Sequence, residues 1–182
     1  MRNIVVLIAL LLSTTFASAQ KYIAKTGHIW FFSHTPMEDI EAHNRQVVSI
    51  LDATTGDIAF NMLIKSFEFK RALMQEHFNE EYMESDKLPK ASFKGKIQDL
   101  SKVDFKKDGT YTVDIAGDMT LHGVTKPFST SAKIDIKGGV ISAKSNFQLV
   151  PKDWDIKIPS LVENKIAKQM DTTVELTYTP SK

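Results

Sequence analysis

Alternation of apolar and polar residues runs through most of the chain and restricts its fold more than any other sequence feature. From Tyr111 to His122 the odd-numbered positions hold Tyr, Val, Ile, Gly, Met and Leu, and the even-numbered positions hold Thr, Asp, Ala or His. This period of two is typical of a β-strand that buries one face and exposes the other. The same alternation recurs in residues 58–64, 91–97, 128–136, 141–149 and 174–178. The pattern therefore predicts an all-β fold.

Short turn-forming sequences separate these segments. They are Thr55-Gly56-Asp57, Asp108-Gly109, His122-Gly123 and Gly138-Gly139, and the last pair predicts a tight hairpin. Strands joined by such short turns are antiparallel neighbours. With two further strands expected near residues 22–32 and 46–53, the chain has eight strands of about ten residues each. Eight antiparallel strands close into a barrel with room for one small ligand.

Three segments interrupt the strand pattern. Thr35-Pro36-Met37-Glu38 has the spacing of a capping box and predicts a short helix or turn that reaches about Ala42. Apolar residues at helical spacing between Lys70 and Met83 predict a helix over one end of the barrel. Ser160-Leu161-Val162-Glu163 is a second capping box and predicts a short helix before the last strand. The expected fold is thus a barrel with one short helix over an end and one or two minor helical turns.

The first nineteen residues are expected to be removed. Arg2, the apolar run over residues 4–12 and the Ala17-Ser18-Ala19 sequence have the order and spacing of a cleaved secretory signal. A transmembrane anchor is the alternative, but the nine apolar residues of this run are far fewer than the roughly 20 that cross a bilayer. We therefore predict a signal peptide over residues 1–19, a single mature domain without a transmembrane segment over residues 20–182, and a periplasmic or secreted location.

Composition excludes several classes of function. The chain has no cysteine, which rules out disulfides, thiolate metal sites and a cysteine nucleophile. Lys and Arg together number 23 and Asp and Glu 22, so there is no surplus of positive charge for binding nucleic acid. None of the five histidines lies in an HExxH sequence, and no GxSxG, Walker-type or GxGxxG sequence is present. The sequence therefore predicts no enzyme activity and no metal site.

Two polar groups of residues look like parts of an active site. Asp118, Thr120 and His122 alternate onto one face, but it is the face opposite the apolar one, so we interpret them as solvent-facing residues. In residues 153–155 two aspartates flank a tryptophan. This arrangement fits a sugar-binding cleft or the polar edge beside a buried or half-buried tryptophan, and we prefer the second interpretation.

The inward-facing positions mix large and small side chains. Small residues such as Ala91, Thr130 and Ala132 face the same interior as the large ones. If the small residues face one another, they leave an apolar space that can hold a ligand. If they only fit the taper of the barrel, the interior is filled. Periodicity alone leaves both alternatives open.

Residues 117–127, with the sequence GDMTLHGVTKP, resemble the strand and turn motif G-D-L-T-x-H-G-V-T-K-P of the YceI-like polyisoprenoid-binding family. Residues 76–93 are similar to that family's helix, its aromatic stretch and the proline before an aromatic strand residue. Together with residues 33–40, they look most like the secreted, Bacteroidetes-type branch. One position differs. Many members have an Arg-Asp pair at the start of the helix segment, where this chain has Leu73-Met74 with Arg71 close by.

The resemblance implies a lipocalin-like, eight-stranded antiparallel β-barrel whose channel holds an isoprenoid, a quinone or a fatty-acid-like amphiphile, with no other cofactor. It implies binding for transport, storage or stress protection. The expected ligand contacts are Phe60, Met62, Met74, His77, Phe78, Asn79, Phe93, Tyr111, Met119, Phe128 and Phe147. Glu84 is a further polar candidate at the mouth, and the alternative for His77, Asn79 and Glu84 is that each only caps or braces the helix. The alternatives are a structural barrel with a filled core and, less favoured, a lipid-modifying enzyme. Pairing of two barrels as a homodimer is left open.

Overall fold

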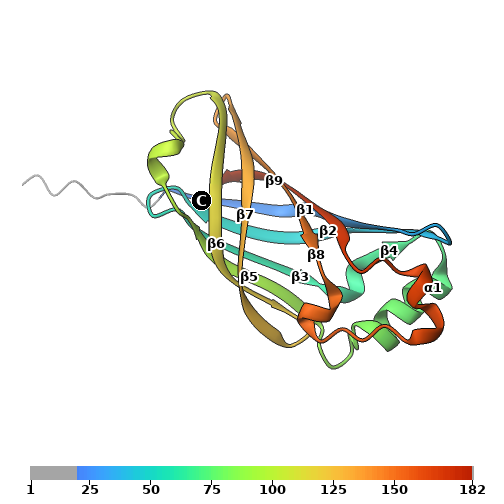
Figure 1. Cartoon of the computed structure of the whole chain (residues 1–182). Coiled ribbons are helices and arrows are strands. Elements are labelled where there is room, and N and C mark those ends of the chain that lie inside the picture. Colours follow the sequence, from blue (N-terminus) through green and yellow to red (C-terminus); the bar gives the residue numbers. More distant parts are fainter. Residues whose placement is uncertain (1–19, 182) are drawn as a thin grey trace, which may run out of the picture.

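The computed structural model describes residues 20–181, so the predicted signal peptide lies outside the described residues. Within them, nine strands form one sheet (Figure 1). The strands are β1 (Lys21–His34), β2 (Asp39–Asp52), β3 (Asp57–Leu63), β4 (Phe67–Phe69), β5 (Lys90–Ile97), β6 (Gly109–Leu121), β7 (Val124–Lys137), β8 (Val140–Leu149) and β9 (Met170–Pro180). The predicted all-β fold is confirmed.

Pairing between β1 and β2 closes the sheet into a barrel. The strands follow the order β1-β9-β8-β7-β6-β5-β3-β2, and β2 pairs back to β1 from Lys21↔Asp52 to His34↔Asp39. The remaining strand, β4, has three residues and pairs with β2 beyond the end of β3. Eight strands therefore make the closed barrel, and each pairs with its neighbours in the antiparallel sense, as predicted.

The alternating residues bury one face of each strand inside the barrel. Val113, Ile134, Ile136 and Ile141 are only 0% to 4% exposed. An apolar side chain of this size stabilises the fold by about 1.5–3 kcal/mol when it is fully buried. Because the chain has no cysteine, this burial and the closed hydrogen-bond ladder hold the barrel together without disulfides.

A short helical segment covers one end of the barrel (Figure 1). It consists of an α-helix, α1 (Ala72–His77), continued by a π-helical turn, η2 (Phe78–Tyr82). This confirms the helix predicted from apolar spacing. The helix predicted before the last strand is present as a 3-10 helix, η5 (Ser160–Lys165). The other 3-10 turns in the described residues are η1 (Ile64–Ser66), η3 (Leu100–Lys102) and η4 (Pro151–Trp154).

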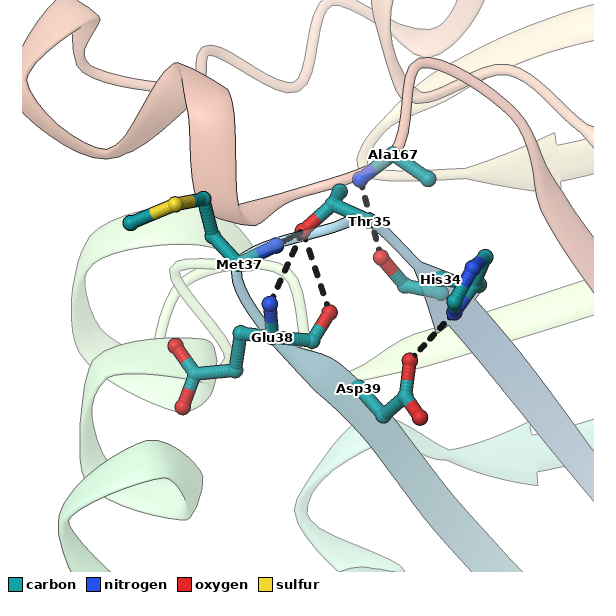
Figure 2. A network of polar contacts seen from close by, with 7 residues as sticks. His34, Thr35, Met37, Glu38, Asp39 and Ala167 are labelled. Carbon is teal, nitrogen blue, oxygen red and sulfur yellow. Dashed lines mark hydrogen bonds and ion pairs between the residues drawn. The ribbon is translucent and has the colours of Figure 1, made fainter.

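The turn between β1 and β2 corrects one prediction. The Thr35 hydroxyl accepts hydrogen bonds from the backbone N–H groups of Met37 and Glu38, at 3.2 and 3.0 Å, as the threonine of a capping box does (Figure 2). The chain does not continue as a helix, because β2 begins at Asp39 and pairs with β1 at once. The helix considered for this segment is therefore wrong, and the turn considered beside it is confirmed.

Two neighbouring strands of the barrel separate along part of their length. β7 pairs with β6 over nearly its whole length, but its ladder with β8 covers only residues 132–137. Beyond the end of that ladder the rings of Phe128 and Phe147 meet, with centroids 4.9 Å apart. We refer to residues 124–131 of β7 and 146–149 of β8 as the β7–β8 seam.

Candidate functional site

Two apolar cavities adjoin inside the barrel. The outer cavity, of about 310 Å³, is lined by residues of α1, η2 and the segment from Pro151 to Met170 together with nearby strand ends. The inner cavity, of about 140 Å³, is lined by residues of the barrel strands. Ile29, Met62 and Leu149 line both, so the two spaces adjoin. Small-molecule sites usually measure about 300–1,000 Å³. The barrel is therefore not completely filled by its own side chains.

Inward-facing strand residues form the wall of the inner cavity. Six of the predicted ligand contacts line it, namely Phe60, Met62, Phe93, Met119, Phe128 and Phe147. Ala132 and Ala143 are the small inward residues beside them. The hydroxyl groups of Thr130 and Ser145, which also line the cavity, lie 3.0 Å apart and hydrogen-bond to each other. Because these hydroxyls are satisfied within the wall, the surface left for a ligand is mainly apolar.

Four aromatic rings from three elements form one wall of the outer cavity. Phe31 of β1, Phe67 and Phe69 of β4 and Phe78 of η2 lie with ring centroids between 4.9 and 6.0 Å apart. Aromatic pairs at these distances contribute about 0.5–1.5 kcal/mol each beyond the area that they bury. Phe78 therefore fixes the helical segment against the barrel.

The helical segment lines the outer cavity with one face. Met74, His77 and Phe78 all line it, because residues three and four positions apart are neighbours on a helix surface. His77 Nδ1 lies 2.9 Å from Glu81 Oε1, one turn further on. Tyr82 also lines the cavity, and burial together with the Glu81 carboxylate raises the pKa of its hydroxyl. The segment thus supplies an apolar cover and a polar edge.

Three charged side chains, Glu38, Arg71 and Lys165, line the outer cavity. Arg71, which directly precedes α1, donates a hydrogen bond to Glu38 in the β1–β2 turn, with Nη2 and Oε1 2.7 Å apart. Lys165, the last residue of η5, lines the same cavity. None of the three is predicted as a ligand contact from the sequence, because they come from distant segments and share no local pattern. An apolar cavity edged by cations suits a long chain that ends in an anionic or strongly polar group.

Two predicted ligand contacts, Tyr111 and Asn79, line neither cavity. Tyr111 is near the start of β6, whose other end lines the cavities, and its hydroxyl donates to the Lys107 carbonyl at 3.0 Å. Alternation identifies the face of a residue but not its height along the barrel. The Asn79 side chain donates to the Gln75 carbonyl and accepts from the Ser85 hydroxyl, both at 2.8 Å. Asn79 therefore braces the helical segment.

His122 and Glu84 belong to a separate cluster that lines neither cavity. His122 was expected to face solvent, but its side chain is only 10% exposed. The reason is that β6 ends at Leu121 and His122 has a φ of 51°, so strand alternation no longer applies. Its Nδ1 lies 3.2 Å from the Trp154 carbonyl oxygen and its Nε2 lies 3.8 Å from Glu84 Oε2. The cluster ties the β6–β7 turn to η4, and Trp154 is buried, which agrees with the preferred interpretation of residues 153–155.

Among residues 20–181, no group of three or more histidine, aspartate and glutamate side chains is placed to hold a metal ion. In the same part of the chain, no helix has both the length and the apolar character needed to cross a membrane.

The YceI-like domain family matches residues 20–179 of the chain. The structure is also similar to solved structures of low sequence identity. A polyisoprenoid-binding domain from Saccharophagus degradans, implicated in plant cell wall breakdown, has a TM-score of 0.76 at 14% identity, with 90% of this chain and 99% of that chain covered. BcnA from Burkholderia cenocepacia has a TM-score of 0.70 at 10% identity, with 84% of this chain and 96% of that chain covered. The YCEI protein of Campylobacter jejuni has a TM-score of 0.63 at 15% identity, with 82% of this chain and 89% of that chain covered. No curated protein matches the chain.

Proposed function

The chain belongs to the YceI-like domain family, and on that premise we propose that it is a periplasmic or secreted binding protein that holds one long-chain amphiphile inside its barrel. The proposed ligand is an isoprenoid, a quinone or a fatty-acid-like molecule, bound for transport, storage or stress protection. The observation that carries the proposal is the pair of adjoining apolar cavities, which extend from the helix-covered end into the barrel. One structural neighbour is a polyisoprenoid-binding domain, which favours the isoprenoid class. Membership of the Bacteroidetes-type branch and pairing as a homodimer stay predictions.

Burial of the ligand's apolar chain should dominate its affinity. One five-carbon isoprene unit gains roughly 4 kcal/mol on burial, at about 0.8 kcal/mol per carbon. One neutral hydrogen bond contributes only about 0.5–1.5 kcal/mol. The entropy lost when the ligand associates and becomes ordered offsets part of this gain, so the two values rank the contributions to affinity and do not give a Kd. The apolar walls of both cavities therefore supply the affinity, and the polar residues of the outer cavity set the choice of head group.

We place the head group in the outer cavity, against Arg71, His77 and Lys165. The Arg71 guanidinium uses Nη2 to bond Glu38 and keeps further N–H donors for a ligand. Arginine recognises carboxylate and phosphate groups with paired hydrogen bonds. This placement leaves the apolar tail directed toward the inner cavity.

A double variant tests the placement of the head group. Arg71→Gln, combined with Glu38→Gln so that no carboxylate loses its partner, should abolish a preference for long-chain acids over the corresponding alcohols. A charge-assisted hydrogen bond is worth about 1.5–3 kcal/mol, so the affinity for the acid should fall about tenfold or more. Competition against a fluorescent fatty acid measures both ligands, and Lys70→Gln at the adjacent exposed position is the control. Equal losses for acid and alcohol would contradict the placement.

We also propose that the protein binds its ligand without chemical conversion. The hydroxyl groups of Thr130 and Ser145 in the inner cavity bond to each other rather than to a histidine or a carboxylate. A serine or threonine hydroxyl becomes a nucleophile when a neighbouring base activates it. The observed pairing therefore favours a binding role over a lipid-modifying one.

Native mass spectrometry tests the proposed function. The mature protein from Gln20 is purified from a bacterial host without detergent, and organic extraction then releases any bound molecule for identification. We expect a long-chain lipid or quinone at stoichiometric amount. A bare mass, with no uptake of added isoprenoids or fatty acids, would overturn the proposal in favour of a structural barrel. Fractionation of a host that expresses the full chain tests the location, with a mature form beginning at Gln20 expected in the periplasm or the medium.

A further inference from the structure

Two histidines from neighbouring strands meet on the outer surface of the barrel. His28 of β1 and His43 of β2 alternate with the buried residues Ile29 and Asn44, so their side chains point away from the interior. His28 Nε2 lies 3.1 Å from His43 Nδ1. Neither histidine lines either of the two cavities, so the pair is separate from the proposed amphiphile site.

A β-bulge in the β1–β2 ladder lies at this pair. The register shifts within residues 27–29, where one residue of β1, His28, faces two residues of β2, 45–46. Bulges of this kind redirect side chains locally and are common beside functional sites. His43 pairs with Trp30, two positions further along β1, so the contact between the two histidine rings runs diagonally across the ladder.

The neighbouring side chains determine where the protons of the two rings lie. Arg45 Nη1 lies 3.4 Å from His28 Nδ1, and because arginine has only donors, this nitrogen accepts. The proton of His28 is then on Nε2, which donates to His43 Nδ1. On the far side of the second ring, His43 Nε2 lies 3.5 Å from Glu41 Oε1. Both rings are therefore neutral, which is the form of imidazole that binds metal ions.

The distance between the two ring nitrogens equals that between neighbouring ligands of one metal ion. Bonds between a metal ion and an imidazole nitrogen measure about 2.0–2.1 Å. With the angles of square-planar or tetrahedral geometry, about 90° or 109°, two such nitrogens lie about 2.8–3.4 Å apart. The observed 3.1 Å falls within this range. Only small rotations of the rings are needed to direct both lone pairs at one ion.

Carboxylates flank the histidine pair on both sides. Glu68 of β4 lies directly opposite His43, and Glu175 of β9 lies directly opposite His28. Residues in such positions have Cβ atoms about 4.5–5.5 Å apart. The charged side chains that contact the pair, face it in a ladder or bond to one of these residues are Glu41, Glu68, Glu175, Arg45 and Lys144. The acids in this set outnumber the bases, which favours a bound cation.

We propose that His28 and His43 bind a divalent transition-metal ion, with Cu²⁺ held most tightly, on the outer wall of the barrel. Imidazole suits Ni²⁺, Cu²⁺ and Zn²⁺, and the affinity of such sites is greatest for Cu²⁺. On binding, the His28 proton moves from Nε2 to Nδ1, His28 Nε2 and His43 Nδ1 bond the ion, and water fills the remaining positions. Arg45 then turns away from the protonated Nδ1. The inference goes beyond amphiphile binding and does not depend on it.

Isothermal titration calorimetry with copper sulfate tests the site in purified mature protein. His28→Gln or His43→Gln should lower the affinity for Cu²⁺ at least about tenfold, because loss of an outer-shell partner alone typically costs about 10–100-fold. His34→Gln is the matched control, since His34 is an exposed β1 histidine whose neighbour, at 2.5 Å, is Asp39 rather than a second histidine. Absence of Cu²⁺ binding by the wild type, or equal affinity in all four proteins, would overturn the proposal.

Fluorescence locates the ion, because Cu²⁺ quenches a tryptophan that it lies beside. Trp30 stacks on His28 with ring centroids 4.5 Å apart, whereas Trp154, the other tryptophan of the chain, is buried beside His122. Trp30→Phe should therefore remove most of the quenching, while calorimetry still shows Cu²⁺ binding, since phenylalanine retains an aromatic ring against His28. Quenching of equal size in this variant would overturn the placement of the ion.

Arg45→Gln distinguishes a metal site from a hydrogen-bonded brace. It removes a cation next to the ion and supplies an amide oxygen that accepts from the His28 Nδ1–H of the metal-bound state, so the affinity for Cu²⁺ should rise about threefold or more. Lys137→Gln, at the exposed end of β7, is the control for loss of one positive charge. Equal affinities of the two variants, or weaker binding by the Arg45 variant, would show that the histidines only brace the strands.

Discussion

Ala132 and Gly95 both occupy inward-facing strand positions, but they differ in what a larger side chain would meet. Ala132 lines the inner cavity. A Cβ atom at Gly95 would meet Phe93 Cζ at 2.2 Å and the Ala116 carbonyl oxygen at 2.6 Å. Because the second contact is with backbone, a substitution at Gly95 would strain β5 and β6. Ala132 is therefore the better position at which to test the cavity.

Ala132→Phe should place a ring in the inner cavity and shorten the space for an apolar chain. Loss of two buried methylene groups of the ligand is worth about 1.6 kcal/mol, so we expect affinity for a long-chain probe to fall about tenfold or more. Overpacking can cost about 1–3 kcal/mol of stability, which denaturant unfolding measures separately. Lys133→Phe, at the next and outward-facing position of β7, is the control. Unchanged uptake by the Ala132 variant would count against an internal site.

Tyr178 provides a pH-dependent test of the barrel interior. Its hydroxyl lies 2.7 Å from Ser49 Oγ, and burial raises its pKa from 10.0 to about 12, although the hydrogen bond with Ser49 acts in the opposite direction. Because the pKa is higher in the folded state, the neutral phenol stabilises the fold fully below about pH 10, and this contribution is lost as the pH rises toward about 12. Absorbance titration should show a late tyrosine step that Tyr178→Phe removes. The same titration curve in both proteins would contradict the assignment.

At the level of elements, the strands were predictable because the face of each residue follows from its immediate neighbours in sequence. The segment predicted over residues 141–149 is observed as Val140–Leu149. The position of a residue along the barrel depends instead on the pairing of many strands, which explains why Tyr111 lies away from the cavities. Pairing also overrides local preference, since the capping sequence at Thr35 forms a turn between two long strands.

Part of the candidate site could be predicted because it depends only on the local spacing of residues in the sequence. The aromatic and methionine residues of the inner cavity follow from alternation, and Met74, His77 and Phe78 follow from helical spacing. Arg71, Glu38 and Lys165 were not predicted as contacts, because they line one cavity only through the packing of a turn, a helix start and a 3-10 helix. Their charges become relevant only when the fold places them beside an apolar space.

The hairpin between β7 and β8 depends on two residues with positive φ. Gly138 and Gly139 have φ values of 56° and 80°, and a Cβ atom at either would meet no other atom within 4 Å. A residue with a Cβ atom at either position would therefore destabilise the turn through its backbone conformation and not through a steric clash. Gly139→Ala should lower the free energy of unfolding by about 1–2 kcal/mol. Gly138→Asn should cost much less, because asparagine tolerates this region. Denaturant unfolding of the two variants compares them, and equal losses would contradict this account of the turn.

At the level of the whole molecule, the strands close into one barrel around the cavities, so a ligand bound inside should stabilise all of them together. β9 pairs with both β1 and β8, so the last strand of the chain completes the barrel around the cavities. A ligand that binds only the folded barrel adds about 2.7 kcal/mol of stability when its concentration is 100 times Kd. For a domain of this size the melting temperature should then rise by roughly 5–10 °C. Calorimetry of delipidated protein with added fatty acid measures the rise. A melting temperature that stays constant at saturating ligand would contradict an internal site.

The β7–β8 seam is the part of the barrel wall at which the circumference of the barrel can change. β7 stays hydrogen-bonded to β6 and β8 to β9, so the two strands can move apart at the seam without loss of a ladder hydrogen bond between them. The cost is the contact between the Phe128 and Phe147 rings, about 0.5–1.5 kcal/mol, together with the hydrogen bonds from the Ser145 hydroxyl to Thr130 and Ser131, about 0.5–1.5 kcal/mol each. A methyl-branched chain is thicker than a straight one, and a seam of this kind accommodates both. The remaining circumference is hydrogen-bonded and fixes the depth of the barrel. The protein should therefore select its ligands by length more strongly than by branching.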